Sequence, residues 1–352
     1  MSEKKNLALI GYGGMGRWHG IMARQNDVVN LLGTYDPDPV RVAIAKEEDG
    51  VFVYDSLEAL LADPRVDLVT VAVPNDLHME LSVKAMKAGK HVICEKPVAM
   101  NCEELEVMIA TAKETGKVFS VHQNRRWDTD KITVGELIAS GGIGKPLTVE
   151  SRVHGSRGIP GDWRKEKEHG GGMIFDWAVH LIDQAIMIFE GVKVTSVYAR
   201  VDNITTTEVD DGCHIVLGFE NGVFYTVEIG TCNYYTLPRF YVRGTKGTAL
   251  IRDWDAPLEV TIETNGIEKD AMPIKAQSGV TKTMAPRDGD TTRTYEIAMP
   301  ESDVHDFYRN ICAVIDGKEE QLVKHDENRR VMQIIEAAFE SAEKNEVIHR
   351  II

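Results

Sequence analysis

The chain has 352 residues, of which 43% are hydrophobic and 27% are charged, as in folded globular proteins of ordinary composition. A chain of this length exceeds a single hydrophobic core, so we expect two domains. Its 40 Lys and Arg residues against 55 Asp and Glu residues give a formal net charge of −15, which disfavours nucleic acid and anionic membranes as partners.

The hydropathy and cysteine patterns narrow the class further. No apolar run approaches the roughly 20 residues that span a bilayer, and the first residues lack the apolar region of a secretion signal. We therefore expect a cytoplasmic protein without a membrane partner. The cysteines are scattered, without a CxxC pair or Cys/His ligand spacing, so the sequence predicts neither disulfides nor a metal site: they are Cys94, Cys102, Cys213, Cys232 and Cys312.

The first third of the chain alternates short apolar runs with helical patterns. The runs cover residues 7–10, 31–35, 68–73, 91–94 and 118–121. Helical patterns lie between them, for example at residues 77–88 and 101–115, where Asn101 can cap the first turn. This rhythm is typical of βαβ units and predicts an α/β fold with a parallel sheet in residues 1–123.

The rhythm changes in residues 124–352, which we interpret as a second α/β domain. Strand-like runs separated by turn signals are found at residues 147–153, 194–201, 214–219, 223–229, 240–242, 248–251 and 258–262. They predict a largely antiparallel sheet. Helices are expected at residues 129–140, 174–189, 302–315 and 327–344, and a long loop at residues 276–294.

A glycine-rich turn follows the first apolar run directly and opens a helix, in the sequence GYGGMG at residues 11–16. In such a GxGxxG turn the glycines permit a tight bend and close approach to a pyrophosphate, which the helix N-terminus then binds. The motif alone is weak, because many glycine-rich turns only connect a strand to a helix. In this context we predict that the cofactor-binding residues are Gly11, Gly13, Gly14, Met15 and Gly16.

Asp36 ends the second apolar run, 20 residues after Gly16. A carboxylate at this point accepts hydrogen bonds from a ribose 2′-hydroxyl and repels a 2′-phosphate, so NAD is favoured over NADP. The alternative is that Asp36, which precedes Pro37, only begins a turn. Together, the glycine turn and Asp36 predict a Rossmann domain in residues 1–123.

Two later strands of the predicted parallel sheet end in polar segments, PNDLH at residues 74–78 and EKP at residues 95–97. Ligands bind outside the carboxyl ends of parallel strands, so these side chains are placed over a cofactor. We predict cofactor contacts from Pro74, Asn75, His78, Glu95 and Lys96. Lys96 is then placed beside a nicotinamide, although a surface lysine in a turn is the ordinary alternative.

The apolar helix expected at residues 174–189 carries Asp176, His180 and Asp183 at spacings of four and three, which puts them on one face. Its apolar stripe consists of Phe175, Val179, Ile182 and Ile186. His180 can accept a hydroxyl proton near neutral pH, and Asp176 can orient it. The alternative is a solvated polar face.

The segment before that helix contains Trp163, Arg164 and three glycines at residues 170–172. Trp163 and Arg164 offer a flat apolar surface and a charged fork for a nicotinamide, a sugar or a phosphate, although Trp163 can equally be a core residue. The glycines permit either a close ligand approach or a sharp entry into the helix. A basic pair, Arg125 and Arg126, can hold an anionic ligand.

The combination of these motifs, in this order, resembles the Gfo/Idh/MocA family of oxidoreductases, named for glucose-fructose oxidoreductase and inositol dehydrogenase. The resemblance covers nearly the whole chain. It implies a Rossmann domain followed by an α/β domain with a large, open, mostly antiparallel sheet, through which copies form a homodimer or homotetramer. It further implies catalytic roles for Lys96, His180 and Asp176, and cofactor contacts from Trp163 and Arg164. The chain departs from the family's pattern at Trp177, where relatives commonly have a smaller residue.

The expected activity is that of an NAD(P)-dependent oxidoreductase, with NAD preferred, which transfers a hydride between nicotinamide and a secondary alcohol or ketone of a sugar, inositol or glycoside. The predicted substrate contacts come from Lys96, Arg125, His154, Arg157, Asp176 and His180. One alternative is a glycosidase that uses bound NAD transiently for oxidation and elimination. Another is a non-catalytic NAD-binding regulator, for which loss of Lys96 or His180 is expected, yet both residues are present.

Overall fold

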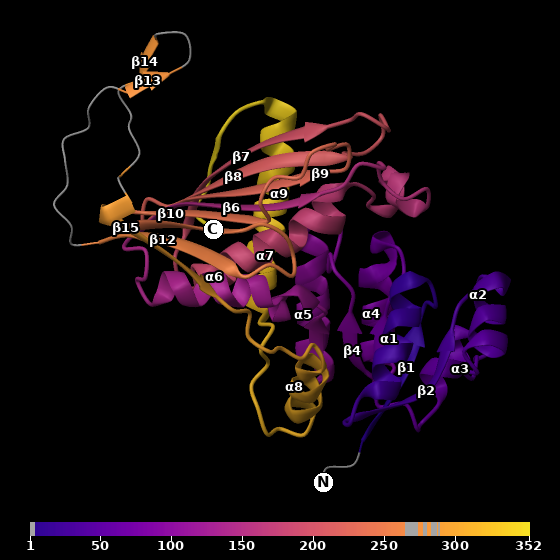
Figure 1. The fold of residues 1–352 in the computed structure, drawn as a ribbon. Helices are drawn as coiled ribbons and strands as arrows, with labels where there is room; N and C mark the ends of the chain where they lie inside the picture. Colours follow the sequence, from indigo (N-terminus) through magenta and orange to yellow (C-terminus); the bar gives the residue numbers. More distant parts are fainter. Residues whose placement is uncertain (1–3, 265–273, 277–279, 283–286, 288) are drawn as a thin grey trace.

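The structure, a computed structural model, describes residues 4–264, 274–276, 280–282, 287 and 289–352 (Figure 1). The first domain contains a five-stranded parallel sheet in the order β2-β1-β3-β4-β5. The strands are β1 (Lys5–Ile10), β2 (Val29–Tyr35), β3 (Leu68–Val71), β4 (His91–Cys94) and β5 (Phe119–Val121). The helices are α1 (Gly14–Gln25), α2 (Pro39–Ala43), α3 (Leu57–Ala62), α4 (His78–Lys87) and α5 (Cys102–Thr115).

The order of this sheet determines where a ligand can bind. The connection from β1 runs outward to β2, whereas β3 lies on the other side of β1. This reversal is a topological switch point, and ligands of doubly wound sheets bind at the carboxyl ends of the strands that flank it. The glycine turn follows β1 and the segment beginning at Ala72 follows β3, so both lie at this point.

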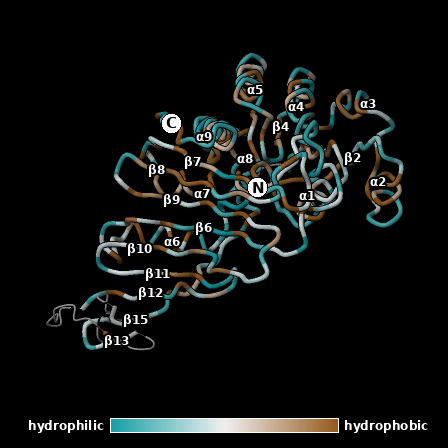
Figure 2. Tube along the Cα trace, turned by 90° about the horizontal axis from the view of Figure 1, so that it is seen from above, coloured by the Kyte–Doolittle hydropathy of each residue, from teal (hydrophilic) through white to brown (hydrophobic). Residues whose placement is uncertain are grey.

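The second domain is built on a nine-stranded sheet in the order β15-β12-β11-β10-β6-β9-β8-β7-β16. Figure 2 shows the strands from β15 to β7 side by side. Its strands are β6 (Pro146–His154), β7 (Val194–Asp202), β8 (Gly212–Phe219), β9 (Phe224–Gly230), β10 (Phe240–Gly244), β11 (Gly247–Ile251), β12 (Leu258–Glu263), β15 (Thr292–Ile297) and β16 (Ile348–His349). Neighbouring strands are antiparallel except β6 and β9, which are parallel. The predicted α/β fold class, with one parallel and one mostly antiparallel sheet, is confirmed.

Three helices pack on one face of the large sheet, namely α6 (Thr129–Ala139), α7 (Val179–Ile188) and α9 (His325–Lys344). Alternate residues of the strands point toward them: in β9, Tyr225 and Val227 are fully buried. On the opposite face Phe224 is 53% exposed. Period-two alternation therefore separates a helix-covered face from an open one.

The C-terminal helices return to the first domain. Tyr308 of α8 (His305–Ile315) contacts His19 of α1, and His325 of α9 bonds the carbonyl of Phe119 in β5. Arg329 of α9 pairs with Glu106 of α5. The last helices therefore tie the two domains together. Residue 123, where the sequence predicted the domain boundary, lies in the segment between β5 and β6.

Some expected elements differ from the structure. The helix at residues 174–189 begins with a π-helical turn over Ile174–Ala178 before α7. The loop expected at residues 276–294 contains β14 (Val280–Lys282), which pairs with β13 (Ile274–Ala276), and the start of β15. The rest of that prediction, at residues 277–279, 283–286 and 288, lies outside the described residues. None of the described helices is long and apolar enough to cross a membrane, and all five cysteines are free.

Candidate active site

The glycine turn has a strict steric requirement at two positions. Gly11 has φ +94°, and a Cβ there would lie 2.2 Å from the carbonyl oxygen of Ala72. A Cβ on Gly16 would lie 2.1 Å from the carbonyl oxygen of Gly11. Only glycine fits both positions, so β1, β3 and α1 meet at backbone contact distance. The first N–H groups of α1 are then free for an anion.

A cavity of about 140 Å³ opens between this turn, the ends of β3 and β4, and the loop before α7. The predicted cofactor-binding residues that line it are Gly13, Gly14, Met15, Pro74, Asn75, Glu95, Lys96, Trp163 and Arg164, together with Asp176. Gly11 and Gly16 do not line the cavity; they allow the close backbone contacts that shape the turn. The cavity therefore brings together side chains of both domains.

Asp36 is buried and held rigidly at the end of β2. Its Oδ2 accepts the N–H of Tyr12 at 2.6 Å, and its Oδ1 accepts the N–H of Asp38 at 2.9 Å. Asp36 thus begins a turn, as the alternative interpretation expected. The same hydrogen bonds also hold the Asp36 carboxylate next to the glycine-rich turn. Arg41, which the sequence reasoning missed, lies 3.7 Å from Asp36 Oδ2 and lines the cavity.

Two residues of the PNDLH segment support the site in different ways. Asn75 donates from Nδ2 to the carbonyl oxygen of Gly170 at 2.8 Å, which links the tip of β3 to the second domain. His78 is completely buried, with Nδ1 2.7 Å from the carbonyl oxygen of Pro97 and Nε2 3.0 Å from that of Val73. The structure therefore places His78 behind the cavity, where it holds the loop that carries Lys96.

Lys96 and Asp176 meet across the two domains. The Lys96 Nζ donates to the Asp176 carbonyl oxygen at 2.9 Å and to its Oδ1 at 3.0 Å. The other carboxylate oxygen lies 3.2 Å from Nε of Arg164, whose NH1 also pairs with Asp162. Burial acts to raise the pKa of Asp176, but the charges of Lys96 and Arg164 outweigh it and hold the pKa below its usual value. Asp176 is therefore an ionised link between two cations, and the expectation that it orients His180 is wrong: its bonds go to Lys96 and Arg164.

His180 lies one turn further along the same helix and is buried. Its Nδ1 finds no hydrogen-bond partner within the described part of the chain. Burial, with the charges of Lys96 and Arg125 added, lowers the pKa of His180 well below its usual value. The imidazole is therefore neutral at physiological pH, with Lys96 close enough to influence it.

A second cavity, of about 460 Å³, adjoins the first at Asp176. It is lined by His154 at the end of β6, by Arg157 in the following loop, and by Trp177. His154 Nε2 lies 3.4 Å from Glu228 of β9, whereas Arg157 is exposed. This cavity is large enough for one sugar or cyclitol ring.

Trp177, the departure from the family's pattern, packs beside this cavity against aromatic and cationic groups. The Arg125 guanidinium lies 4.3 Å from its ring centroid and 5.1 Å from that of Trp254. The Trp177 ring also meets the His180 ring edge to face, at 5.9 Å. Arg125 pairs with Asp128 at 3.0 Å, so it supports the Trp177 wall rather than lining either cavity.

The alternative of a solvated polar face on this helix is wrong. Asp183 accepts both Nε and NH2 of Arg126, at 2.9 and 2.6 Å, and both side chains are buried. Arg126 also pairs with Glu327 of α9 at 2.6 Å. Its donors are therefore occupied by structural partners, and the basic pair does not form an anion site.

The three glycines before the helix have a role in backbone conformation. Gly172 has φ +102°, and a Cβ there would lie 2.3 Å from Asp210 Oδ1. The Asp210 carboxylate accepts the N–H groups of Met173 and Ile174, both at 2.8 Å, where the helix begins. This supports the sharp entry into the helix that the sequence allowed.

A parallel sheet with a dinucleotide-type glycine turn, completed by ionisable side chains from a second sheet domain, defines a two-domain NAD-binding oxidoreductase. Residues 5–123 match the model of an oxidoreductase family with an NAD-binding Rossmann fold, and residues 132–250 match the GFO/IDH/MocA C-terminal domain. The chain therefore belongs to the Gfo/Idh/MocA family of oxidoreductases, as its motifs suggested.

Solved and curated relatives agree with this assignment. An NAD-binding protein from Listeria innocua is 43% identical and superposes with a TM-score of 0.94 over 99% of this chain and 100% of that one. An uncharacterized oxidoreductase of Schizosaccharomyces pombe is 30% identical over 85% of both chains. The scyllo-inositol 2-dehydrogenase (NADP(+)) IolW of Bacillus subtilis is 27% identical over 97% of this chain and 95% of its own length.

Proposed function

We propose that the protein is an NAD-dependent dehydrogenase that interconverts a secondary alcohol and a ketone of a sugar, inositol or glycoside. The observation that carries the proposal is the contact between Lys96 of the Rossmann domain and Asp176 of the second domain, at 3.0 Å. Asp176 lines both cavities, so this contact lies where a dinucleotide and a substrate would meet.

The residues around the first cavity fit a nicotinamide dinucleotide. The N-terminus of α1 is suited to the pyrophosphate, and the close packing at Gly11 and Gly16 brings the backbone within reach of it. The fixed carboxylate of Asp36 is suited to the ribose hydroxyls of NAD. When bound, the nicotinamide supplies the hydride acceptor.

Lys96, Asp176 and His180 then divide the remaining chemistry. An ammonium has three N–H donors, and Lys96 directs two of them at Asp176, so one remains for a substrate hydroxyl. That donor stabilises the negative charge that develops on oxygen during oxidation. His180 lines neither cavity, but its ring packs against Trp177, which lines the second. It is neutral and has an unpaired Nδ1 among the described residues, so it is in the form that accepts the hydroxyl proton. Asp176 holds Lys96 in place.

The second cavity supports a polyhydroxylated ring as the substrate. His154 and Arg157 supply polar contacts on one side, and the Trp177 ring supplies a flat apolar surface on another. IolW, which is similar over nearly the whole chain, is named for an inositol substrate. Inositols and sugars are therefore the first compounds to assay.

The test is a panel of inositols, polyols, sugars and glycosides, each with NAD and with NADP, followed at the absorbance band of the reduced nicotinamide. We expect Lys96→Met and His180→Asn to lower kcat at least about 100-fold while NAD still binds. Lys87→Met, at an exposed lysine of α4, is the matched control. Near wild-type turnover by either active-site variant, or no affinity for either dinucleotide, would overturn the proposal. Aglycone release from a glycoside without NADH accumulation would identify the transient-oxidation glycosidase instead.

We also propose that copies associate through the open face of the large sheet. This face lies opposite α6, α7 and α9 and carries the half-exposed Phe224 of β9, which lies across from Gly218 of β8. An exposed aromatic side chain on a wide sheet face that none of the described helices covers is suited to a subunit interface, where aromatic residues are enriched. A homodimer or homotetramer in solution is the expected assembly.

A further inference from the structure

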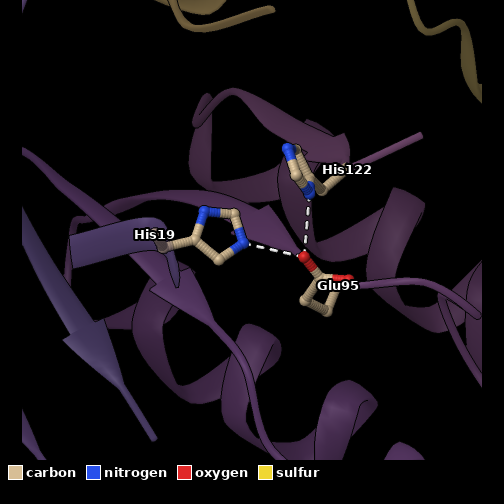
Figure 3. Close-up of side chains that lie close together, drawn as sticks. All are labelled: His19, Glu95 and His122. Atoms are coloured by element: carbon tan, nitrogen blue, oxygen red, sulfur yellow. Dashed lines mark hydrogen bonds and ion pairs between the residues drawn. The ribbon is translucent and has the colours of Figure 1, made fainter. Parts of the chain in front are cut away.

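A buried group of ionisable side chains, of which Glu95 also lines the first cavity, lies next to Lys96 and has no role in the chemistry proposed above. It consists of His19 of α1, Glu95 at the end of β4, and His122 just after β5 (Figure 3). Glu95 Oε1 accepts from His19 Nε2 at 2.7 Å and from His122 Nδ1 at 2.8 Å. The Tyr308 hydroxyl of α8 makes a short contact with His19 Nδ1. The carboxylate at the end of β4 therefore binds residues of α1 and of the end of β5, and α8 is linked to it through His19.

The hydrogen bonds fix the state of this carboxylate. Each imidazole directs one ring N–H at Oε1, and the Tyr308 hydroxyl satisfies the other nitrogen of His19. Burial acts to raise the pKa of Glu95, but His122 and His19 outweigh it and hold the pKa well below its usual value. The carboxylate is ionised although only 4% of Glu95 is exposed.

The second oxygen of the Glu95 carboxylate binds the backbone of Lys96. Glu95 Oε2 accepts the backbone N–H of Lys96 at 3.2 Å. On the other side of Lys96, the carbonyl oxygen of Pro97 lies 2.7 Å from His78 Nδ1. The backbone that carries the Lys96 side chain is thus held at both of its neighbours, while the ammonium itself reaches Asp176.

Stability alone does not explain this arrangement. Taking a carboxylate out of water carries a penalty of several kcal/mol, and well-packed apolar side chains often serve stability equally well. A metal site is disfavoured by the geometry, because both imidazole nitrogens point at the same oxygen at hydrogen-bond length. What the carboxylate adds is an acceptor aimed at the Lys96 amide.

We propose that Glu95 is a positioning residue: clamped by His19 and His122, it fixes the Lys96 backbone so that the ammonium meets the substrate hydroxyl. The inference rests on the proposed function of Lys96. Misplacement of a reacting group by about 1 Å can lower a rate about 100-fold. The cluster also makes this position depend on the docking of α8, through Tyr308.

The first test is Glu95→Gln, which keeps the shape of the side chain. An amide has a single acceptor oxygen, so it cannot accept the N–H groups of both imidazoles and of Lys96 in the present arrangement. We expect kcat to fall about 10- to 100-fold, while KM and the NADH dissociation constant stay within about threefold. Glu58→Gln, at an exposed carboxylate of α3 that pairs with Lys84, is the control and should leave kcat unchanged.

Two further measurements keep the inference falsifiable. Hydrogen exchange at the Lys96 amide, followed by NMR, should be about tenfold faster in Glu95→Gln, with no comparable change at the β4 amides. Should Glu95→Gln not fold, Tyr308→Phe removes only the distal hydroxyl and should lower kcat about three- to tenfold with KM unchanged.

The inference would be overturned if Glu95→Gln had the kcat and the Lys96 amide exchange rate of the wild-type protein. If only Tyr308→Phe folds, a wild-type kcat in that variant would overturn it. So would one equivalent of bound metal that is lost on Glu95→Gln. If the wild-type protein oxidises nothing in the panel, the proposed function fails, and the exchange measurement still decides whether Glu95 holds the Lys96 backbone.

Discussion

Replacing Asp36 with serine should reduce the preference for NADH over NADPH about 100-fold. The carboxylate cannot turn away from a 2′-phosphate, because the N–H groups of Tyr12 and Asp38 hold its two oxygens at 2.6 and 2.9 Å. Two unit negative charges about 5 Å apart repel by about 3 kcal/mol at an effective dielectric constant of about 20, which corresponds to roughly 100-fold in affinity. Arg41, 3.7 Å from Asp36 Oδ2, is then released to bind the phosphate.

The assay is fluorescence titration of each variant with NADH and NADPH at one fixed ionic strength. Asp36→Ser should gain NADPH affinity while losing some NADH affinity, and Asp36→Ser combined with Arg41→Ala should lose most of that gain. Equal affinity of the wild-type protein for both dinucleotides would refute the reasoning. A parallel change in both dissociation constants on Asp36→Ser would refute it as well.

Three other predictions concern stability and assembly. Burial raises the pKa of Asp210 to about 6, above its unfolded value of about 4, so wild-type stability should fall by about 2 kcal/mol as the pH rises from 4 to 6. Asp210→Asn should lack this loss in urea unfolding at the two pH values. Asp183→Asn breaks the buried pair with Arg126 and should destabilise the protein by about 3 kcal/mol in urea; a change below about 1 kcal/mol would contradict the pairing. Phe224→Arg on the open sheet face should shift the assembly toward monomer in light scattering coupled to size exclusion, whereas an unchanged mass would exclude this face as the interface.

Local periodicity accounts for most of the fold. Every strand of the first sheet coincides with an apolar run, and so does each of the seven inner strands of the nine-stranded sheet, because each run is bounded by turn signals. β16 was missed because it has two residues, and pairing with β7 rather than any pattern of its own makes it a strand. The π-helical turn at Ile174–Ala178 was missed because its residues have the same apolar character as an α-helix.

The residues of the candidate site likewise fall into those that local sequence patterns predict and those that depend on contacts between distant segments. The glycine turn, Lys96, Asp176 and His180 could be predicted because each belongs to a short motif at a strand end or on a helix face. The partners of buried charges could not: His19 and Tyr308 are 289 positions apart, and nothing local links Arg126 to Glu327. Arg41 could have been noticed in the sequence as a cation five residues after Asp36, but the periodicity of the pattern does not predict that its side chain lies near the glycine-rich turn.

The return of α8 and α9 to the Rossmann domain explains how a contact as short as that of Lys96 with Asp176 can form between two separate sheets. Lys5 of β1 pairs with Asp316 just after α8, and Arg329 of α9 pairs with Glu106 of α5. Near the site itself, Arg126 joins α7 to α9 through Asp183 and Glu327. Because these contacts lie on several elements of both domains, the geometry of the site is set by their packing rather than by the single segment that joins the sheets. Weakening one of them therefore acts on the distance between Lys96 and Asp176 without touching either residue.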